Sequence, residues 1–248
     1  MKKLILSIVL SVLFVGIVFP QGIKIPLIGS KAPSFTEETT NGQITFPDDF
    51  GKKWKILFSH PQDFTPVCSS ELLELAYMQK EFDQLGVKLA VISTSDLALH
   101  KMWKAHLESL DYKGRGPQKI QFPLFDDHQY VASKLYGMLH EPESTNMDIR
   151  GVFIIDSKNI VRAINFYPMK VGRNIKEIVR IVEALQTSDK ASVLTPANWN
   201  PGEDVLVGHL PYTEKELADN PKLKNDYYSV GDRMWFKKGD KSGTADKN

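Results

Sequence analysis

The sequence contains a single cysteine, Cys68, with neighbours that can make its thiol nucleophilic. A thiol reacts as the thiolate, which nearby positive charge or hydrogen-bond donors stabilise. Thr65 and Pro66 are typical of a helix start, so Cys68 falls in the first turn, where free N–H groups and the helix dipole favour an anion. On composition alone, a lone cysteine is more often an inert buried side chain. The local pattern instead favours a reactive thiolate, and any disulfide it forms must join it to another molecule.

A longer motif surrounds this cysteine. Pro61, Thr65 and Cys68 have the spacing PxxxTxxC, within the string FSHPQDFTPVC that ends at Cys68. This motif resembles the signature of the peroxiredoxin family. Further segments are similar to its one-cysteine subfamily, namely RGVFIID at 150–156, YP at 167–168, GRN at 172–174 and TPANW at 195–199. Ordered matches at sensible separations are a stronger signal than one motif, and together they cover most of the chain.

The resemblance implies an α/β, thioredoxin-like fold and a thiol-dependent peroxidase. Cys68 would attack one oxygen of hydrogen peroxide or of an organic hydroperoxide, the other oxygen would leave as water or an alcohol, and Cys68 would become a sulfenic acid. The Thr65 hydroxyl, the Cys68 N–H and the Arg150 guanidinium would bind the peroxide and stabilise its leaving oxygen. Pro61 would shield the thiolate from water. Each of these three residues also has a non-catalytic interpretation: Thr65 as an ordinary helix cap, Pro61 as a strand terminator and Arg150 as an exposed arginine.

Three further residues are expected to support the site. His60 resembles a histidine of the one-cysteine subfamily that lies near the thiol, although a backbone-bonded buried histidine is an equal alternative. Glu71 resembles a family glutamate in the active-site hydrogen-bond network, or else is a solvated helix residue. Arg173 is similar to a second arginine near the site, but its spacing also suits an ion pair with Glu177.

The order of apolar segments predicts alternating strands and helices. Short apolar or β-branched runs predict strands at 42–46, 54–59, 87–93, 151–156 and 160–166, the last two joined by a turn at 157–159. Apolar residues at helical spacing predict one helix that begins at 65 and ends before Gly86. The same spacing predicts further helices at 97–110, 129–137 and 174–186. This alternation is typical of an α/β layered fold.

The chain divides into three predicted parts. Residues 27–187 form the thioredoxin-like peroxidase domain, and residues 188–248 form a small C-terminal module after a loop rich in Pro, Asn and Gly. The polar end, 239–248, is expected to be disordered. Residues 1–22 are read as a signal peptide or an N-terminal membrane anchor, because two lysines precede the uncharged apolar run 4–19.

This leader predicts export, to the periplasm of a bacterium. Signal-peptide cleavage favours small residues before the cleavage site, but positions 18–20 are Val18, Phe19 and Pro20. An uncleaved anchor in the inner membrane, formed by 4–19, is therefore the alternative. A cytoplasmic location follows if the leader is not used.

Composition and motifs argue against several other functions. A formal charge of +1 with scattered basic residues gives no support to nucleic-acid binding. A disulfide oxidoreductase needs a second cysteine, no cysteine-protease signature surrounds Cys68, and no metal-binding pattern such as HExxH occurs. His100 and His106 are six positions apart. We expect neither a metal nor a cofactor.

The lipase-type serine that some relatives carry is missing from the segment 50–54, so phospholipase activity by that route is not supported. A non-catalytic redox sensor or thiol-relay protein of the same fold remains the alternative.

The expected partners are a peroxide and an external thiol of unknown identity that resets the cysteine. The resemblance also implies a homodimer, formed through sheet or loop contacts that involve the C-terminal module, or a ring of such dimers.

Overall fold

The computed structural model describes residues 24–210 and 212–239. The predicted leader and anchor, residues 1–22 and 4–19, lie outside the described residues, as does nearly all of the predicted disordered tail. Within the described part, no helix has the length and apolar character needed to cross a membrane. The elements form a seven-stranded sheet with helices on both faces, followed by a separate three-stranded sheet.

The main sheet and its helices account for the chain up to residue 191. The strands are β1 (Phe35–Thr39), β2 (Gly42–Phe46), β3 (Trp54–Ser59), β4 (Val87–Ser93), β5 (Leu124–Asp126), β6 (Arg150–Ile155) and β7 (Val161–Tyr167). The helices are the short 3-10 helix η1 (Asp48–Phe50), α1 (Pro66–Gln84), α2 (Leu97–Leu107), α3 (Val131–Leu135) and α4 (Ile175–Ala191). The strand order is β2-β1-β5-β4-β3-β6-β7, with β3, β4 and β5 parallel and the outer strands antiparallel to their neighbours. The predicted α/β, thioredoxin-like fold is confirmed.

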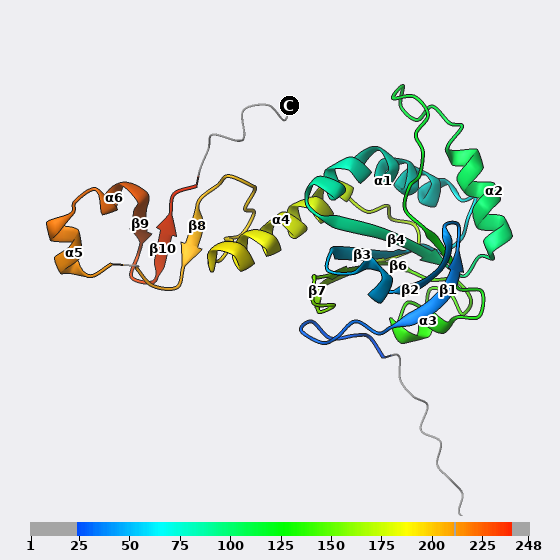
Figure 1. Cartoon of the computed structure of the whole chain (residues 1–248), viewed down its shortest axis with the longest axis horizontal. Coiled ribbons are helices and arrows are strands. Elements are labelled where there is room, and N and C mark those ends of the chain that lie inside the picture. Colours follow the sequence, from blue (N-terminus) through cyan, green and yellow to red (C-terminus); the bar gives the residue numbers. More distant parts are fainter. Residues whose placement is uncertain (1–23, 211, 240–248) are drawn as a thin grey trace, which may run out of the picture.

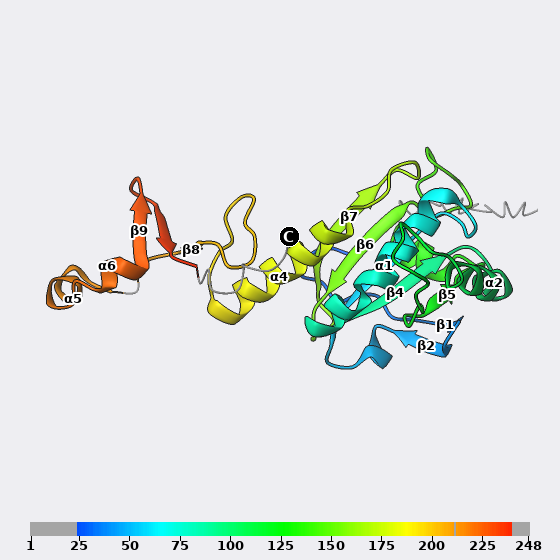
Figure 2. The same ribbon diagram turned by 90° about the horizontal axis from the view of Figure 1, so that it is seen from above.

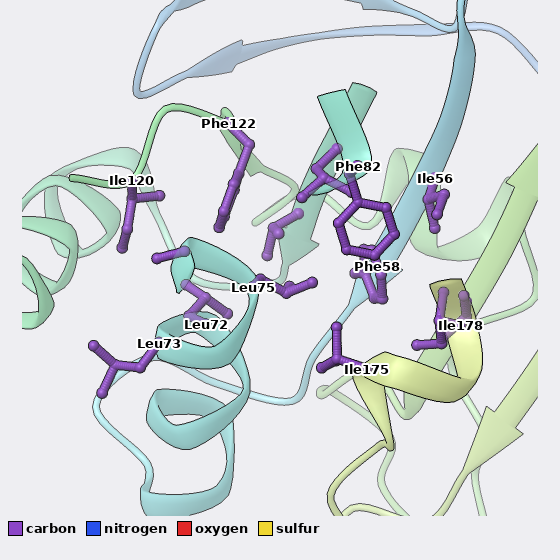
Figure 3. Packing of buried hydrophobic residues seen from close by; sticks show 14 of the residues in the cluster. Ile56, Phe58, Leu72, Leu73, Leu75, Phe82, Ile120, Phe122, Ile175 and Ile178 are labelled. Carbon is purple, nitrogen blue, oxygen red and sulfur yellow. The ribbon is translucent and has the colours of Figure 1, made fainter. Parts of the chain in front are cut away.

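Alternating side chains of the central strands build a core on each face of the sheet. Ile56 and Phe58 of β3 face α1 and α4, whereas Leu57 between them faces α3. Figure 3 shows the first core, where leucines of α1 and isoleucines of α4 meet the β3 side chains. In Figure 1, α1 and α3 lie on opposite sides of the sheet. This two-sided burial fixes the start of α1, and therefore Cys68, against the end of β3.

Several predicted bounds were wrong, for local reasons. The predicted helix 129–137 shrinks to α3, because Tyr130 has a left-handed backbone with a φ of 61° and cannot continue a helix. The predicted helix 97–110 ends at Leu107, where the Ser109 hydroxyl donates to the His106 carbonyl. The predicted helix 174–186 continues to Ala191, since Asp189 is held by Arg162 of β7.

Strand β1 was not predicted at all. Its sequence FTEET carries polar side chains between the inward-facing Phe35 and Thr39, so little apolar alternation shows. The strand forms because it pairs with β2 in register, with Phe35 opposite Phe46.

The C-terminal module consists of short elements, as predicted. These are β8 (Val205–Val207), α5 (Glu214–Asp219), α6 (Leu223–Asp226), β9 (Tyr227–Val230) and β10 (Met234–Lys237), with sheet order β8-β10-β9. Figures 1 and 2 both show the module standing away from the main sheet, at the far end of α4. Its link to α4 is a small apolar cluster of Val193, Trp199 and Val205.

A close backbone approach at Gly151 ties β6 to β3. The Ser59 hydroxyl donates to the Ile149 carbonyl at 2.7 Å and accepts from the Gly151 N–H at 2.8 Å. A Cβ at Gly151 would lie 2.9 Å from that hydroxyl and 3.1 Å from the Phe153 ring. We expect Gly151→Ala to lower the free energy of unfolding by about 1–3 kcal/mol, as overpacking does, in urea denaturation.

The matched control for that substitution is Gly208→Ala, because a Cβ there meets no atom within 4 Å. An equal effect of the two substitutions would contradict the close-approach argument.

Candidate active site

Cys68 lies where the sequence predicted it, in the first turn of α1. Thr65 is the N-cap residue and Pro66 the first helical residue. The thiol side chain is fully buried and belongs to the core between the sheet and α1. The first N–H groups of the helix have no acceptor within the helix, so an anion at this position is stabilised by them and by the helix dipole.

Arg150, the first residue of β6, brings a positive charge to the sulfur. Its Nη1 lies 3.3 Å from Cys68 Sγ. The other guanidinium nitrogens, Nε and Nη2, donate to the Met169 carbonyl at 2.9 and 2.6 Å. Because Arg150 is only 2% exposed, the alternative of an ordinary surface arginine is wrong.

Glu71 joins the two predicted arginines. Its Oε2 accepts from Arg150 Nη1 at 2.8 Å and from Arg173 Nη2 at 2.7 Å. Its Oε1 accepts from the Arg173 Nε and backbone N–H. Arg173 also donates to the carbonyls of Ser59, the last residue of β3, and Gly151, the second residue of β6. All three side chains are buried, so the solvated-residue alternative for Glu71 is wrong.

The alternative ion pair between Arg173 and Glu177 does not form. Glu177 is bound instead by Arg180, one turn further along α4, at 2.7 and 2.8 Å. Arg173 therefore belongs to the network around Cys68.

His60 lies beside the thiol at the end of β3. The imidazole is fully buried and interacts with Cys68, and its ring lies tilted by 38° against the Trp103 ring, with centroids 5.1 Å apart. Neither ring nitrogen has a normal hydrogen bond to a nitrogen or oxygen among the described residues, so the backbone-satisfied alternative is wrong. Burial alone would lower the pKa of His60, but the sulfur and Asp63 raise it above its usual value.

Thr65 and Pro61 line the turn that leads into α1. The Thr65 hydroxyl does not cap the helix: it donates to the Gln62 carbonyl at 3.0 Å. The same hydroxyl is close enough to Cys68 to stabilise the thiolate, and rotation about its C–O bond would aim it at the sulfur or a bound molecule. Pro61 is buried next to His60.

The electrostatics of these groups favour the thiolate. Burial alone would raise the pKa of Cys68, but His60, Thr65 and Arg150 together lower it to about 6. The pKa of the neighbouring His60 shifts upward, so the two groups tend toward a thiolate and an imidazolium. The site thus holds a nucleophile that is ionised at neutral pH, with cationic donors around it.

The pKa predicts how Cys68 alkylation depends on pH. We expect the rate with iodoacetamide to rise about tenfold per pH unit at acidic pH, since only the thiolate reacts. The rate should level off above about pH 7, because the pKa of Cys68 is lowered to about 6. A midpoint near that of free cysteine, about 8.5, would contradict the assignment.

Three buried polar residues near the thiol were missed by the sequence reasoning. Asp63 lies in the turn before α1, 3.6 Å from His60 Nε2, and binds His100 of α2. In the sequence, His100 was notable only for its spacing from His106, which does not suit a metal site. Asp148 is fully buried near His60, and its carboxyl oxygens have no hydrogen-bond partner among the described residues. The string QDF in the motif contains Asp63, but nothing in it shows which residue that carboxylate meets.

No group of three or more metal-ligating side chains occurs among the residues that the structure describes.

Comparisons with known proteins agree with this geometry. The model of the AhpC/TSA family matches residues 28–164, and that of the C-terminal domain of 1-Cys peroxiredoxin matches residues 184–217. A peroxiredoxin of Methanosarcina mazei is 48% identical over 183 residues, which cover 73% of this chain and 84% of the relative. Peroxiredoxin 2 of Caldanaerobacter subterraneus is 41% identical over 214 residues, covering 86% of this chain and 94% of the relative.

Solved structures are similar over most of the chain. A yeast mitochondrial 1-Cys peroxiredoxin, studied for thiol resolution via glutathione/thioredoxin systems, has a TM-score of 0.75 at 34% identity. The alignment covers 87% of this chain and all of that one. A Cys-to-Ser mutant of peroxiredoxin 6 from Arenicola marina has a TM-score of 0.76 at 29% identity, covering 87% of this chain and 99% of that one.

Proposed function

The chain belongs to the AhpC/TSA family and is a one-cysteine, thiol-dependent peroxidase, and from this premise we propose that Cys68 reduces hydrogen peroxide and small organic hydroperoxides. The observation that carries the proposal is the 3.3 Å contact between Arg150 Nη1 and Cys68 Sγ. This contact places a fixed cation where both the attacking sulfur and the departing oxygen carry negative charge.

The reaction transfers two electrons from sulfur to the peroxide. The Cys68 thiolate attacks one oxygen, an S–O bond forms and the O–O bond breaks. The departing oxygen takes a proton and leaves as water or an alcohol, and the protein keeps a sulfenic acid. Arg150 is held against rotation by Met169 and Glu71, so it is oriented before the peroxide arrives. The Cys68 N–H and the Thr65 hydroxyl would be the remaining donors to the peroxide.

The burial of Cys68 supports a preference for small substrates. The thiol side chain has no exposed surface in this state. Residues around it, such as the 61–68 segment, must therefore move before a peroxide can reach the sulfur. Hydrogen peroxide has the least volume to accommodate. We therefore place it ahead of bulky organic hydroperoxides as the preferred substrate.

The resetting step needs an external thiol, because Cys68 is the only cysteine. One thiol condenses with the sulfenic acid to give a mixed disulfide and water. A second thiol attacks that disulfide and restores Cys68. The similar yeast mitochondrial protein is described with glutathione/thioredoxin systems, and we propose a reductant of one of these two kinds here.

A homodimer is supported by two surfaces. Strand β7 ends the main sheet, and among the described residues only its first residue, Val161, forms backbone hydrogen bonds on the outer side, with Ser30 and Gly29. No other described strand lies beside the rest of β7. The C-terminal module stands away from its own sheet in Figures 1 and 2. We propose that β7 pairs with β7 of a second copy and that each module covers the other chain.

We also propose that residues 1–22 direct export, to a bacterial periplasm. The support is the sequence alone, two lysines followed by an uncharged apolar run. Cell fractionation of the full chain and of a version lacking these residues tests it. Recovery of the full chain in the cytoplasm would contradict export, and recovery in the membrane fraction would favour anchoring over cleavage.

The peroxidase proposal is tested by stopped-flow mixing of reduced protein with equimolar hydrogen peroxide, followed by trapping and mass spectrometry of Cys68. We expect sulfenic acid to form much faster than in free cysteine, and excess thiol to restore Cys68 over many turnovers. Oxidation no faster than in free cysteine would contradict the enzyme. Fast oxidation that is passed only to another protein would instead indicate a redox sensor.

A further inference from the structure

A buried histidine and a buried aspartate form an ion pair behind the reactive thiol. His100, on α2, is fully buried, and Asp63, in the turn before α1, is 3% exposed. His100 Nδ1 lies 2.7 Å from Asp63 Oδ2. The other ring nitrogen, Nε2, lies 2.9 Å from the carbonyl oxygen of Phe125 in β5. The imidazole is thus fixed at both nitrogens, between the active-site turn and the sheet.

These two contacts hold the Asp63 carboxylate through His100. A carbonyl oxygen only accepts hydrogen bonds, so Nε2 of His100 donates to Phe125. The other ring nitrogen, Nδ1, shares a hydrogen bond with Asp63 Oδ2, so this buried oxygen is not left without a partner.

The second oxygen of Asp63 faces the active site. Oδ1 lies 3.6 Å from His60 Nε2 and accepts from the Ser93 hydroxyl at 3.4 Å. His60 in turn lies beside Cys68 and packs at a tilt against Trp103. A continuous set of contacts runs from the Phe125 carbonyl through His100, Asp63 and His60 to the sulfur.

We propose that Asp63 and His100 are positioning residues for Cys68: His100 holds the Asp63 carboxylate in place, and Asp63 orients His60 and favours its cationic form against the thiolate. This inference rests on the proposed function, since it concerns the same thiolate. Asp63 Oδ1 is 3.6 Å from His60 Nε2, which is too long for a hydrogen bond but close enough for the carboxylate to attract an imidazolium.

Other charged groups around His60 act in both directions. Arg173, before α4, opposes a cation on His60, whereas the Cys68 thiolate on α1 favours it. Asp148, before β6, also faces His60, but burial above all raises its pKa to about 8, so it is mostly neutral at pH 7. The ring of His100 itself stands 6.4 Å from that of His60. Asp63 is therefore the carboxylate that supports the His60 cation at neutral pH.

The experiment compares thiolate formation in four full-length proteins: wild type, His100→Gln, His60→Gln and the double variant. The pH titration of Cys68 is followed by the ultraviolet absorbance of the thiolate. At the pH where half of the wild-type thiol is ionised, we expect His100→Gln to lower the thiolate fraction about fivefold. In the His60→Gln background, the same substitution should change nothing further, because its effect passes through His60.

A second variant distinguishes loss of the Asp63 interaction from unfolding of the protein. Asp63→Asn keeps the side-chain volume but removes the negative charge beside His60, so it should lower the thiolate fraction in the same direction. His128→Gln is the matched control, since His128 forms a 2.6 Å pair with Asp126 but is half exposed and outside the contacts described above. It should leave the titration unchanged. Near-ultraviolet circular dichroism checks that each variant is folded.

Two results would overturn the inference. One is an unchanged Cys68 titration in folded His100→Gln or Asp63→Asn. The other is an equal change with and without His60, which would mean that His100 acts only by packing. Failure of the proposed function looks different, because wild-type Cys68 would then react with hydrogen peroxide no faster than free cysteine while the titrations could still be measured.

Discussion

Replacing Arg150 with methionine is expected to slow the oxidation of Cys68 by hydrogen peroxide about a hundredfold to a thousandfold. The guanidinium lies 3.3 Å from the sulfur and is the strongest donor available to a departing oxygen. Methionine keeps much of the side-chain length. Glu71 retains its bonds to Arg173 in the variant, so no unpaired buried carboxylate is left behind. Stopped-flow rates of sulfenic acid formation measure the effect.

Part of that loss would come from a smaller thiolate fraction, since Arg150 helps to lower the pKa of Cys68. Rates are therefore compared per thiolate, with the fraction taken from a titration of each protein. Arg162→Met is the control, because Arg162 pairs with Asp189 away from the sulfur. A rate per thiolate equal to wild type in Arg150→Met would show that the arginine sets only the ionisation of Cys68.

The second large effect concerns Glu71, the carboxylate between the two arginines. Glu71→Gln should lower the free energy of unfolding by about 3–5 kcal/mol, because two buried guanidinium groups would lose their only described carboxylate partner. Glutamine has nearly the same shape, so packing is preserved. Urea denaturation at neutral pH measures the change. Glu74→Gln is the control, since Glu74 binds Arg115 and Lys113 nearer the surface.

This stabilisation should depend on pH in a defined direction. Burial alone would raise the pKa of Glu71, but Arg173 and Arg150 hold it below its usual value. A carboxyl group with a lowered pKa in the folded state stabilises the fold above its unfolded-state pKa, and this contribution is lost as the pH falls. The difference between wild type and Glu71→Gln should therefore be largest at neutral pH and shrink below about pH 4.3. A difference that does not change with pH would contradict the ion-pair explanation.

The fold could be predicted from the sequence because its strongest signals are local. The strands at 42–46, 54–59 and 87–93 have the predicted bounds, since each is a short apolar or β-branched run between turn residues. Strand β1 lacks such a pattern, and α3 is cut short by the left-handed backbone at Tyr130. In both places long-range pairing or a single backbone angle decided the outcome.

The site was predictable only in part. The motif indicated Cys68, Thr65 and Pro61, and the family resemblance added Arg150. Which carboxylate each arginine binds was not readable, because Arg173 lies four positions before Glu177 but reaches Glu71, 102 residues earlier in the sequence. The contact of His100 with Asp63 likewise joins residues 37 positions apart. These partners meet because β3, β6 and α1 pack around one buried point. The sequence separation of two residues does not predict such a contact.

The two edge strands of the seven-stranded sheet, β2 and β7, differ in the charged groups that contact their backbones. At β2 the Asp49 carboxylate accepts from the Thr45 N–H at 2.7 Å and places a negative charge along that margin. At β7, residues 162–167 are half-buried, and Arg162 binds Asp189, but no described carboxylate accepts from the backbone N–H groups of this strand. An open strand of this kind is a template for aggregation. If β7 pairs with its copy, that pairing covers the template, so a substitution that weakens the dimer should make the protein more prone to aggregate at an unchanged concentration.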